Sequence, residues 1–286
     1  MKPSPPDAAT SAAAEGTVVW VSGSSGKLGR EVCRQLRAIG VEVLEADRQG
    51  PSPVDLTDAA AVARSMRGAT AIIHCAAIPT PEHTEPSELV RNNTMACFNA
   101  LEQAWLGGVR TAVLASSGSI CGTAFSPEPL LFSSIPVDES TPLKFVDPYA
   151  LTKDFTERMG EMYARRGMTV TALRLHWILT AREAAEVART ADDADDAANL
   201  WGWVELEDAA RACVLALQPR PEHRGYEAVV IASDETRSQT PTKELLDRHL
   251  AGATRHQSFG GHAGGFDTSR AAAVIGWYPT RSWRHG

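Results

Sequence analysis

The segment 17–36 constrains the fold of this chain more than any other. A run of β-branched and apolar residues over 17–21 predicts a buried strand, and sequence typical of a helix follows the turn. Three glycines lie between them, spaced Gly23-x-x-Gly26-x-x-Gly29. Glycine permits positive φ and close backbone approach, while a helix N-terminus offers free N–H groups and partial positive charge. The segment therefore predicts a phosphate cradle, whose other candidate members are Ser25, Lys27 and Leu28.

A second predicted strand, 41–46, ends at Asp47, which lies 24 positions after Gly23. An acidic side chain at about this distance meets the adenosine ribose in dinucleotide-binding folds. Asp47 favours NAD because it would repel a 2′-phosphate, and Arg48 keeps NADP as the alternative because a cation could bind that phosphate. Asp55 and Leu56 are further cofactor-binding candidates. Asp55 is either an adenine ligand or a helix cap. A tight turn without a ligand is the alternative for the glycines.

Two more strands are predicted at 71–74 and 111–115. His74 ends the first, and a hydrogen-bonded core histidine is favoured there over a catalytic group. Asn93 lies near the apolar stripe of a predicted helix, where it either bonds a neighbouring strand or serves the cofactor. Small residues at the end of a strand let a cofactor approach the backbone, which makes candidates of Cys75, Ala76 and Ala77.

The length of 286 residues allows one large domain or a domain with a smaller lobe. We expect a disordered tail at 1–16, a dinucleotide-binding core at 17–180 and a substrate-binding lobe at 181–286 with segments that return to the core. Within that lobe the acidic stretch 181–199 predicts a solvated loop, and 260–265 a flexible connection or lid.

The charge and the cysteine content of the chain indicate which partners and cellular setting to expect. The formal net charge of −7 argues against nucleic acid, and no apolar run reaches the roughly 20 residues of a membrane span. Five scattered cysteines without a CxxC pair indicate a reducing, cytoplasmic setting, with no disulfides and no metal site.

The chemistry is predicted at Asp147-Pro148-Tyr149-Ala150-Leu151-Thr152-Lys153, which opens a helix to about residue 166. Tyr149 and Lys153 are four residues apart and share one helix face. A lysine cation ~4 Å from a phenolate, at an effective dielectric of about 20, stabilises it by up to ~4 kcal/mol. The pair therefore predicts a tyrosine that works as a base near neutral pH, with a surface contact as the alternative.

These motifs occur together in the order and spacing of one superfamily. The glycine triplet, Asp47, His74 to Ala77, Asn93, Ser116-Ser117 and Tyr149-x-x-x-Lys153 resemble the short-chain dehydrogenase/reductase superfamily. The match is closest to its extended branch, the NAD-dependent epimerase/dehydratase family. The resemblance implies an α/β fold of Rossmann type: a doubly wound, mainly parallel sheet with a small C-terminal substrate-binding lobe.

The resemblance also implies roles for the catalytic residues. Tyr149 would be the general acid/base, Lys153 would bind the nicotinamide ribose and assist the tyrosine, and Ser117 would bond the reacting oxygen. Two departures stand out. Cys121 occupies the place of a frequent tyrosine, and Ser-Gly-Ser at 117–119 replaces the Thr-Asp-Glu set of dehydratases, which disfavours sugar dehydration. The substrate-binding candidates are Ser119, Arg174, His176 and Trp177, with packing as the alternative for Arg174.

We therefore expect an NAD(P)-dependent oxidoreductase that transfers hydride between nicotinamide and a secondary alcohol or ketone. The alternatives are an epimerase that retains NAD and a non-catalytic dinucleotide sensor. Only 109 residues (286 − 177) follow Trp177, so we expect a compact sugar or sugar acid rather than a nucleotide sugar. A homodimer through the helices at 89–106 and 149–166 completes the expected partners.

Overall fold

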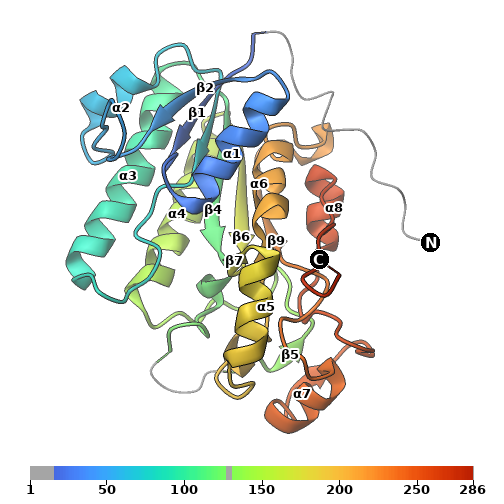
Figure 1. Ribbon diagram of the computed structural model, residues 1–286. Helices are drawn as coiled ribbons and strands as arrows, with labels where there is room; N and C mark the ends of the chain where they lie inside the picture. The colour runs from blue at the N-terminus through green and yellow to red at the C-terminus, as the bar shows by residue number, and fades with distance from the viewer. Residues whose placement is uncertain (1–15, 127–130, 286) are drawn as a thin grey trace.

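The computed structural model describes residues 16–126 and 131–285, and its centre is a six-stranded parallel sheet. The strand order is β2-β1-β3-β4-β6-β9 (Figure 1). The strands are β1 (Val18–Ser22), β2 (Glu42–Ala46), β3 (Ala71–His74), β4 (Thr111–Ser117), β6 (Thr169–Leu175) and β9 (Tyr226–Ile231). The chain order reverses between β1 and β3, and such a switch point opens a ligand crevice at the carboxyl edge of a parallel sheet. The predicted doubly wound fold is confirmed.

Helices cover both faces of the sheet, as Figure 1 shows. One hydrophobic cluster joins the sheet to α1 (Lys27–Ala38), α6 (Leu206–Leu215) and α8 (Ser269–Ile275). A second cluster joins the opposite face to α2 (Ala59–Ser65), α3 (Pro86–Leu106) and α4 (Pro148–Arg165). The sheet is therefore buried on both sides, which explains why its strands read as almost continuous apolar runs.

A smaller unit of short elements lies beyond the carboxyl edge of the sheet. It contains two two-stranded sheets, one of β5 (Ser134–Ile135) with β10 (Thr254–Arg255), the other of β7 (Ile178–Leu179) with β8 (Val204–Glu205). It also contains α7 (Thr242–His249) and the 3₁₀ turns η2 (Gly118–Cys121) and η3 (Ala197–Asn199). A third hydrophobic cluster, which includes Trp201 and Phe266, forms its core. The turn η4 (Pro221–His223) lies at the opposite, amino edge of the sheet, directly before β9.

The solvated loop expected at 181–199 is wrong. Residues Ala181–Thr190 form helix α5, because Thr180 and Glu183 make a reciprocal capping box at its start. The acidic residues that follow are also engaged. The carboxylate of Asp193 accepts hydrogen bonds from the hydroxyls of Ser238 (2.6 Å) and Thr240 (2.7 Å). The carboxylate of Asp193 is thus bonded to the segment after β9 and is not simply solvated.

The flexible connection or lid expected at 260–265 is also tied down. The carbonyl of His262 accepts the backbone N–H of Thr236 at 2.8 Å, and Gly264 donates its own N–H to Asp234 at 2.8 Å. The hydroxyl of Thr242 donates to the carbonyl of Ala263 at 2.8 Å. The segment therefore packs against the start of α7 instead of standing free.

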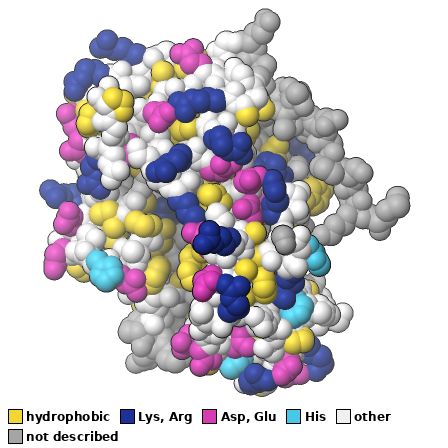
Figure 2. Space-filling model, in the orientation of Figure 1, with side chains coloured by type: hydrophobic (Ala, Val, Ile, Leu, Met, Phe, Trp, Pro, Cys, Tyr) yellow, Lys and Arg dark blue, Asp and Glu magenta, His cyan; other side chains and the backbone are white. Residues whose placement is uncertain are grey.

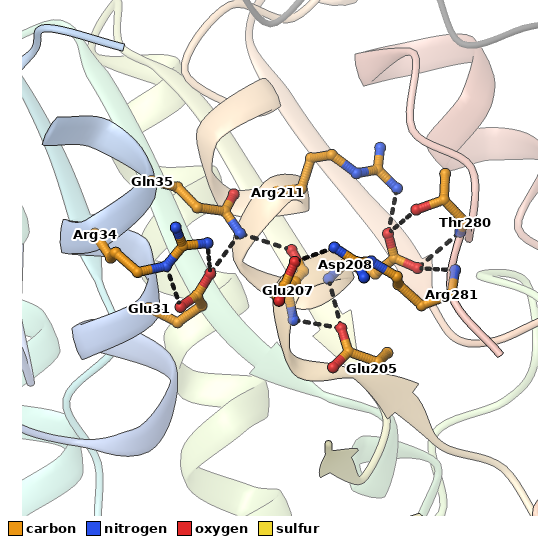
Figure 3. Close-up of polar contacts among 9 residues, drawn as sticks. All are labelled: Glu31, Arg34, Gln35, Glu205, Glu207, Asp208, Arg211, Thr280 and Arg281. Atoms are coloured by element: carbon orange, nitrogen blue, oxygen red, sulfur yellow. Dashed lines mark hydrogen bonds and ion pairs between the residues drawn. The ribbon is translucent and has the colours of Figure 1, made fainter. Parts of the chain in front are cut away.

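The C-terminal segment is anchored to α6 by a buried carboxylate, drawn in Figure 3. Asp208, only 2% exposed, accepts hydrogen bonds from the N–H and hydroxyl of Thr280 (both 2.7 Å) and from the N–H of Arg281 (2.9 Å). Beside it, Gln35 on α1 donates to the carbonyl of Glu207 at 2.9 Å. The bonds of Asp208 thus hold the C-terminal segment on α6, and the bond of Gln35 joins α6 to α1, the helix that follows the glycine turn.

The remaining sequence expectations concern the tail, the cysteines and the membrane. The expected tail at 1–16 lies, apart from Gly16, outside the described residues. All five cysteines are free thiols, and no metal-binding cluster occurs over 16–126 and 131–285. None of the helices in these ranges combines the length and hydrophobicity needed to cross a bilayer.

Candidate active site

The glycine turn after β1 is shaped so that only glycine fits. Gly23 has φ +68°, and a Cβ there would lie 2.8 Å from the backbone of Ala76. A Cβ on Gly29 would lie 2.1 Å from the carbonyl oxygen of Gly23. Helix α1 starts at Lys27, and its N-cap, Gly26, has no side chain to occupy the N–H groups of the first turn. This cradle fits a dinucleotide pyrophosphate, which the exposed amides would bind.

Asp47 lies beside this cradle at the end of β2. Its carboxylate accepts the backbone N–H groups of Ser25 and Gln49, both at 3.0 Å. The carboxylate oxygens have further acceptor capacity toward ribose hydroxyls. Exposed Arg48 follows it and lines an open cavity of about 690 Å³, together with Ile78, His83, Thr84, Glu85 and Glu88.

The carboxyl end of β3 forms the floor beside the cradle. Cys75, Ala76 and Ala77 are only partly buried there, so the backbone is accessible over small side chains. Asn93 on α3 holds this segment: its amide oxygen accepts the N–H of Ile78 (2.8 Å) and its amide nitrogen donates to the carbonyl of Ile78 (3.1 Å). Asn93 therefore bonds the loop that follows β3, whereas one of its two alternatives was a bond to a neighbouring strand.

His74 and the Asp55–Leu56 pair lie in different surroundings. His74 is 3% exposed, its Nδ1 lies 2.7 Å from the hydroxyl of Ser22, and burial lowers its pKa to about 3. The favoured interpretation, a hydrogen-bonded core histidine, is confirmed. Asp55 accepts the N–H and hydroxyl of Thr57, which lower its pKa. Leu56 is buried, with its carbonyl bonded by Asn99.

Tyr149 and Lys153 project from the first turns of α4. Asp147 caps this helix by accepting the N–H of Ala150 at 2.8 Å, and Pro148 begins it. The ammonium group of Lys153 lies 5.4 Å from the centre of the Tyr149 ring and donates to the carbonyl of Ala115 at 2.7 Å. Both side chains are almost completely buried, so the lysine is held in place with two further N–H groups for a ligand.

Ser117 completes the constellation from the end of β4. Its hydroxyl oxygen accepts the N–H of Ser119 at 3.2 Å and the Ser119 hydroxyl at 2.9 Å. Because Ser119 supplies the protons in this pair, the Ser117 hydroxyl keeps its own proton for another acceptor. The site therefore combines a hydroxyl donor, a phenol and a buried cation at one sheet edge, beside a dinucleotide cradle.

Comparison with known proteins agrees with this geometry. The sequence profile described as "NAD dependent epimerase/dehydratase family" matches residues 19–232. The chain belongs to this family. It is accordingly an NAD-dependent enzyme of the short-chain dehydrogenase/reductase type, as the motifs predicted. No curated protein matches the sequence at a significant level.

Solved structures share the fold at low identity. A short-chain dehydrogenase/reductase superfamily protein from Agrobacterium tumefaciens with bound NAD is 21% identical, with a TM-score of 0.70 over 93% of this chain and 94% of that one. The UDP-glucose 4-epimerase of Thermotoga maritima, solved with UDP-glucose, is 19% identical, with a TM-score of 0.70 over 94% and 96%. A mutated uronate dehydrogenase is 20% identical, with a TM-score of 0.66 over 94% and 83%.

Cys121 occupies the position at which the resemblance implied a tyrosine. Its side chain is buried, and burial raises its pKa to about 11, so the thiol stays protonated near neutral pH. The next residue, Gly122, has φ +89°, and a Cβ there would lie 2.3 Å from the carbonyl oxygen of Lys144. The loop is therefore tight, and the cysteine supplies no reactive group.

The structure does not bring Arg174 to the substrate side of the site. Its guanidinium group is buried and makes a two-pronged ion pair with Glu157 on α4, at 3.0 and 2.9 Å. It also donates to the carbonyl of Glu139 at 3.2 Å. Packing, the alternative weighed for Arg174, thus describes its surroundings.

His176 and Trp177 follow β6 into the crevice. The His176 ring packs against Phe266, with ring centres 3.7 Å apart, and desolvation lowers its pKa to about 3, so it is neutral. Phe125, which the sequence did not single out, contacts the edge of the Tyr149 ring at 6.0 Å between centres. Trp177 is 51% exposed.

Proposed function

We propose that this protein is an NAD-dependent oxidoreductase that acts on a secondary alcohol or ketone of a compact substrate. The observation that carries the proposal is the buried Tyr149 with the Lys153 ammonium 5.4 Å from its ring centre, at the edge that holds Ser117. A buried cation beside a phenol stabilises the phenolate, because screening by water is weak there. Tyr149 is then the general acid/base.

Each residue has one task in the proposed reaction. Ser117 donates its hydroxyl proton to the substrate oxygen and fixes that oxygen next to the phenol. Tyr149 removes the hydroxyl proton during oxidation and returns it during reduction. Lys153 stabilises the phenolate and offers its remaining N–H groups to the ribose. NAD, when bound, supplies the hydride acceptor.

An epimerase is the second candidate. Several similar structures are named UDP-sugar epimerases, while one is named uronate dehydrogenase. Both activities fit the same acid/base pair, because an epimerase oxidises and then re-reduces its substrate. Net accumulation of NADH with a substrate supports the dehydrogenase, and conversion without accumulation supports the epimerase.

We propose a free sugar, a sugar acid or a similar small alcohol rather than a nucleotide sugar as the substrate. A diphosphate is usually bound by arginines that are free to chelate it. Here Arg189 pairs with Glu186, Arg211 with Asp208, and Arg237 with Asp196. The test is thermal unfolding of the NAD-loaded protein with UDP or dTDP, and stabilisation beyond any effect at the adenine site contradicts this proposal.

Preference for NAD over NADP follows from Asp47. Its carboxylate, next to the cradle, accepts two backbone N–H groups and would repel a 2′-phosphate. Arg48 is exposed and could bind that phosphate. Tighter binding of NADP than of NAD in parallel titrations would show that attraction to Arg48 outweighs repulsion by Asp47.

We also propose a cytoplasmic homodimer with no nucleic-acid or membrane partner. Helices α3 and α4 lie side by side and expose Met95, Phe98 and Phe155 at 36–39%. Apolar surface on adjacent helices suits an isologous interface. Basic and acidic side chains are mixed on the face in Figure 2, which offers no broad positive field. A monomeric mass in solution would refute the dimer.

The proposed activity is tested by a screen of sugars, sugar acids, nucleotide sugars and small hydroxy acids for NADH formation. The same screen with the Tyr149→Phe variant is the control. We expect turnover of at least one compact substrate by the wild type alone, whereas equal turnover by the variant would remove Tyr149 from the reaction.

A further inference from the structure

Trp177 lies at the point where the glycine cradle and the catalytic edge meet. Strand β6 ends at Leu175, whose register partner on β4 is Ser117. Two residues later the carbonyl of Trp177 accepts the N–H of Val204 at 2.9 Å, and that of Ile178 accepts the ammonium of Lys27 at 3.1 Å. The backbone at Trp177 is therefore held between the cradle and the smaller unit, at the carboxyl edge where such sheets bind ligands.

The indole of Trp177 is open to solvent although its neighbours in the same unit are not. Trp201 and Trp203 are 1% and 0% exposed, whereas Trp177 is 51% exposed. An indole is among the largest apolar surfaces that a side chain offers, and covering it releases water.

One face of this indole rests on a buried cation. The guanidinium carbon of Arg237 lies 4.6 Å from the ring centre, and the Arg237 side chain is only 1% exposed. Both terminal nitrogens of Arg237 bond the carboxylate of Asp196, with Nη2 at 2.6 Å, and its backbone N–H donates to Trp201 at 3.0 Å. Because the guanidinium covers one face, the exposed surface of Trp177 is the other face and the edge.

We propose that the open face of Trp177 is a stacking platform for the ring of a cyclic sugar or sugar acid, and that the Arg237–Asp196 pair positions it. The inference rests on the proposed function and adds a ring-shaped substrate to it. The C–H face of a sugar ring is apolar and flat enough to cover an indole. The cation behind the indole makes its open face a poor site for a second cation, so the ring is neutral or anionic.

The experiment compares ring and open-chain substrates in steady-state kinetics of the full chain with saturating NAD. D-galactose, D-glucuronate and D-galacturonate are the ring compounds, and galactitol and D-gluconate are the open-chain counterparts. The variants are Trp177→Phe, Trp177→Ala, Arg237→Met and Arg237→Lys. Tyr278→Ala is the matched control, because Tyr278 is 49% exposed and lies on the C-terminal segment.

For Trp177→Ala we expect KM for the ring compounds to rise about tenfold with kcat within about twofold, a loss of about 1.4 kcal/mol in binding. Trp177→Phe should be intermediate, open-chain KM values should stay constant, and Tyr278→Ala should match the wild type. Arg237→Met should raise the ring KM, with partial rescue in Arg237→Lys. If the Arg237 variants do not fold, the KM values of the Trp177 variants test the platform, because Trp177 is exposed.

An unchanged ring KM in Trp177→Ala, or an equal rise for ring and open-chain substrates, overturns the platform. Tyr149-dependent turnover of the open-chain alcohols without any turnover of rings overturns the platform but leaves the proposed oxidoreductase intact. Turnover of neither class overturns the platform, and the absence of turnover in the wider substrate screen as well refutes the proposed oxidoreductase.

Discussion

Replacing Glu157 by alanine should strongly destabilise the protein, because it leaves a buried cation without its partner. Glu157 and Arg174 are 6% and 8% exposed, and the carboxylate accepts two bonds from Arg174, at 3.0 and 2.9 Å. It also accepts the hydroxyls of Ser116 at 2.7 Å and Tyr226 at 3.2 Å. Removing one member of such a buried pair costs about 3–5 kcal/mol.

This cost is a large part of the roughly 5–15 kcal/mol that stabilises a typical domain. The measurement is urea unfolding followed by circular dichroism, with the slope compared between variants. Glu161→Ala is the matched control, one helical turn along α4, because Glu161 pairs at 3.2 Å with Arg165, whose side chain is 75% exposed. Exposed pairs of this kind contribute about 0.2–1 kcal/mol.

A double variant separates the charge from the packing. Combining Glu157→Leu with Arg174→Met removes both charges, so it should be more stable than Glu157→Leu alone. If Glu157→Ala costs no more than Glu161→Ala, or if the double variant is the less stable, the buried pair does not hold α4 in place. Arg174 would then be open again as a substrate ligand.

Three further predictions concern the cradle and its surroundings. Burial keeps His74 neutral with a pKa of about 3, so the unfolded chain gains a proton below about pH 6.5 while the folded chain does not. Stability should therefore fall by about 2 kcal/mol more in the wild type than in His74→Asn between pH 7 and pH 5 in urea unfolding, and equal slopes would contradict it. Gly29→Ala should abolish NAD binding in calorimetry, since the new Cβ would lie 2.1 Å from the Gly23 carbonyl oxygen, and normal affinity would contradict the cradle. The ammonium of Lys27 pairs with Glu183 at 2.5 Å, and both side chains are exposed, so the pair contributes little energy. Lys27→Met should therefore speed NAD dissociation in stopped flow by no more than about fivefold. A far larger change would assign the lysine to the cofactor itself.

The central sheet and the chemistry could be predicted because each has a local signal. Strand β3 has the bounds that its apolar run indicated, and the glycine turn follows β1, the strand beside which the chain order reverses. Tyr149 and Lys153 are four residues apart on one helix, so their proximity is dictated by helical geometry.

The rest depends on contacts between distant segments. Arg174 is equally suited to a substrate anion and to Glu157, and only the packing of α4 on β6 decides between them. Asp196 and Arg237 are 41 positions apart, with no periodic pattern to connect them. Helix α5 has a single fully buried residue, Ala184, so its apolar stripe is too weak to be recognised among acidic residues.

The most direct test of the whole account is the Tyr149→Phe variant with NAD affinity and turnover measured side by side. The ring stays in place beside Lys153, so NAD should bind as in the wild type while oxidation of the best substrate falls by about 10²–10⁴-fold. Unchanged turnover at unchanged NAD affinity would contradict the account, because the proton would then move through another group.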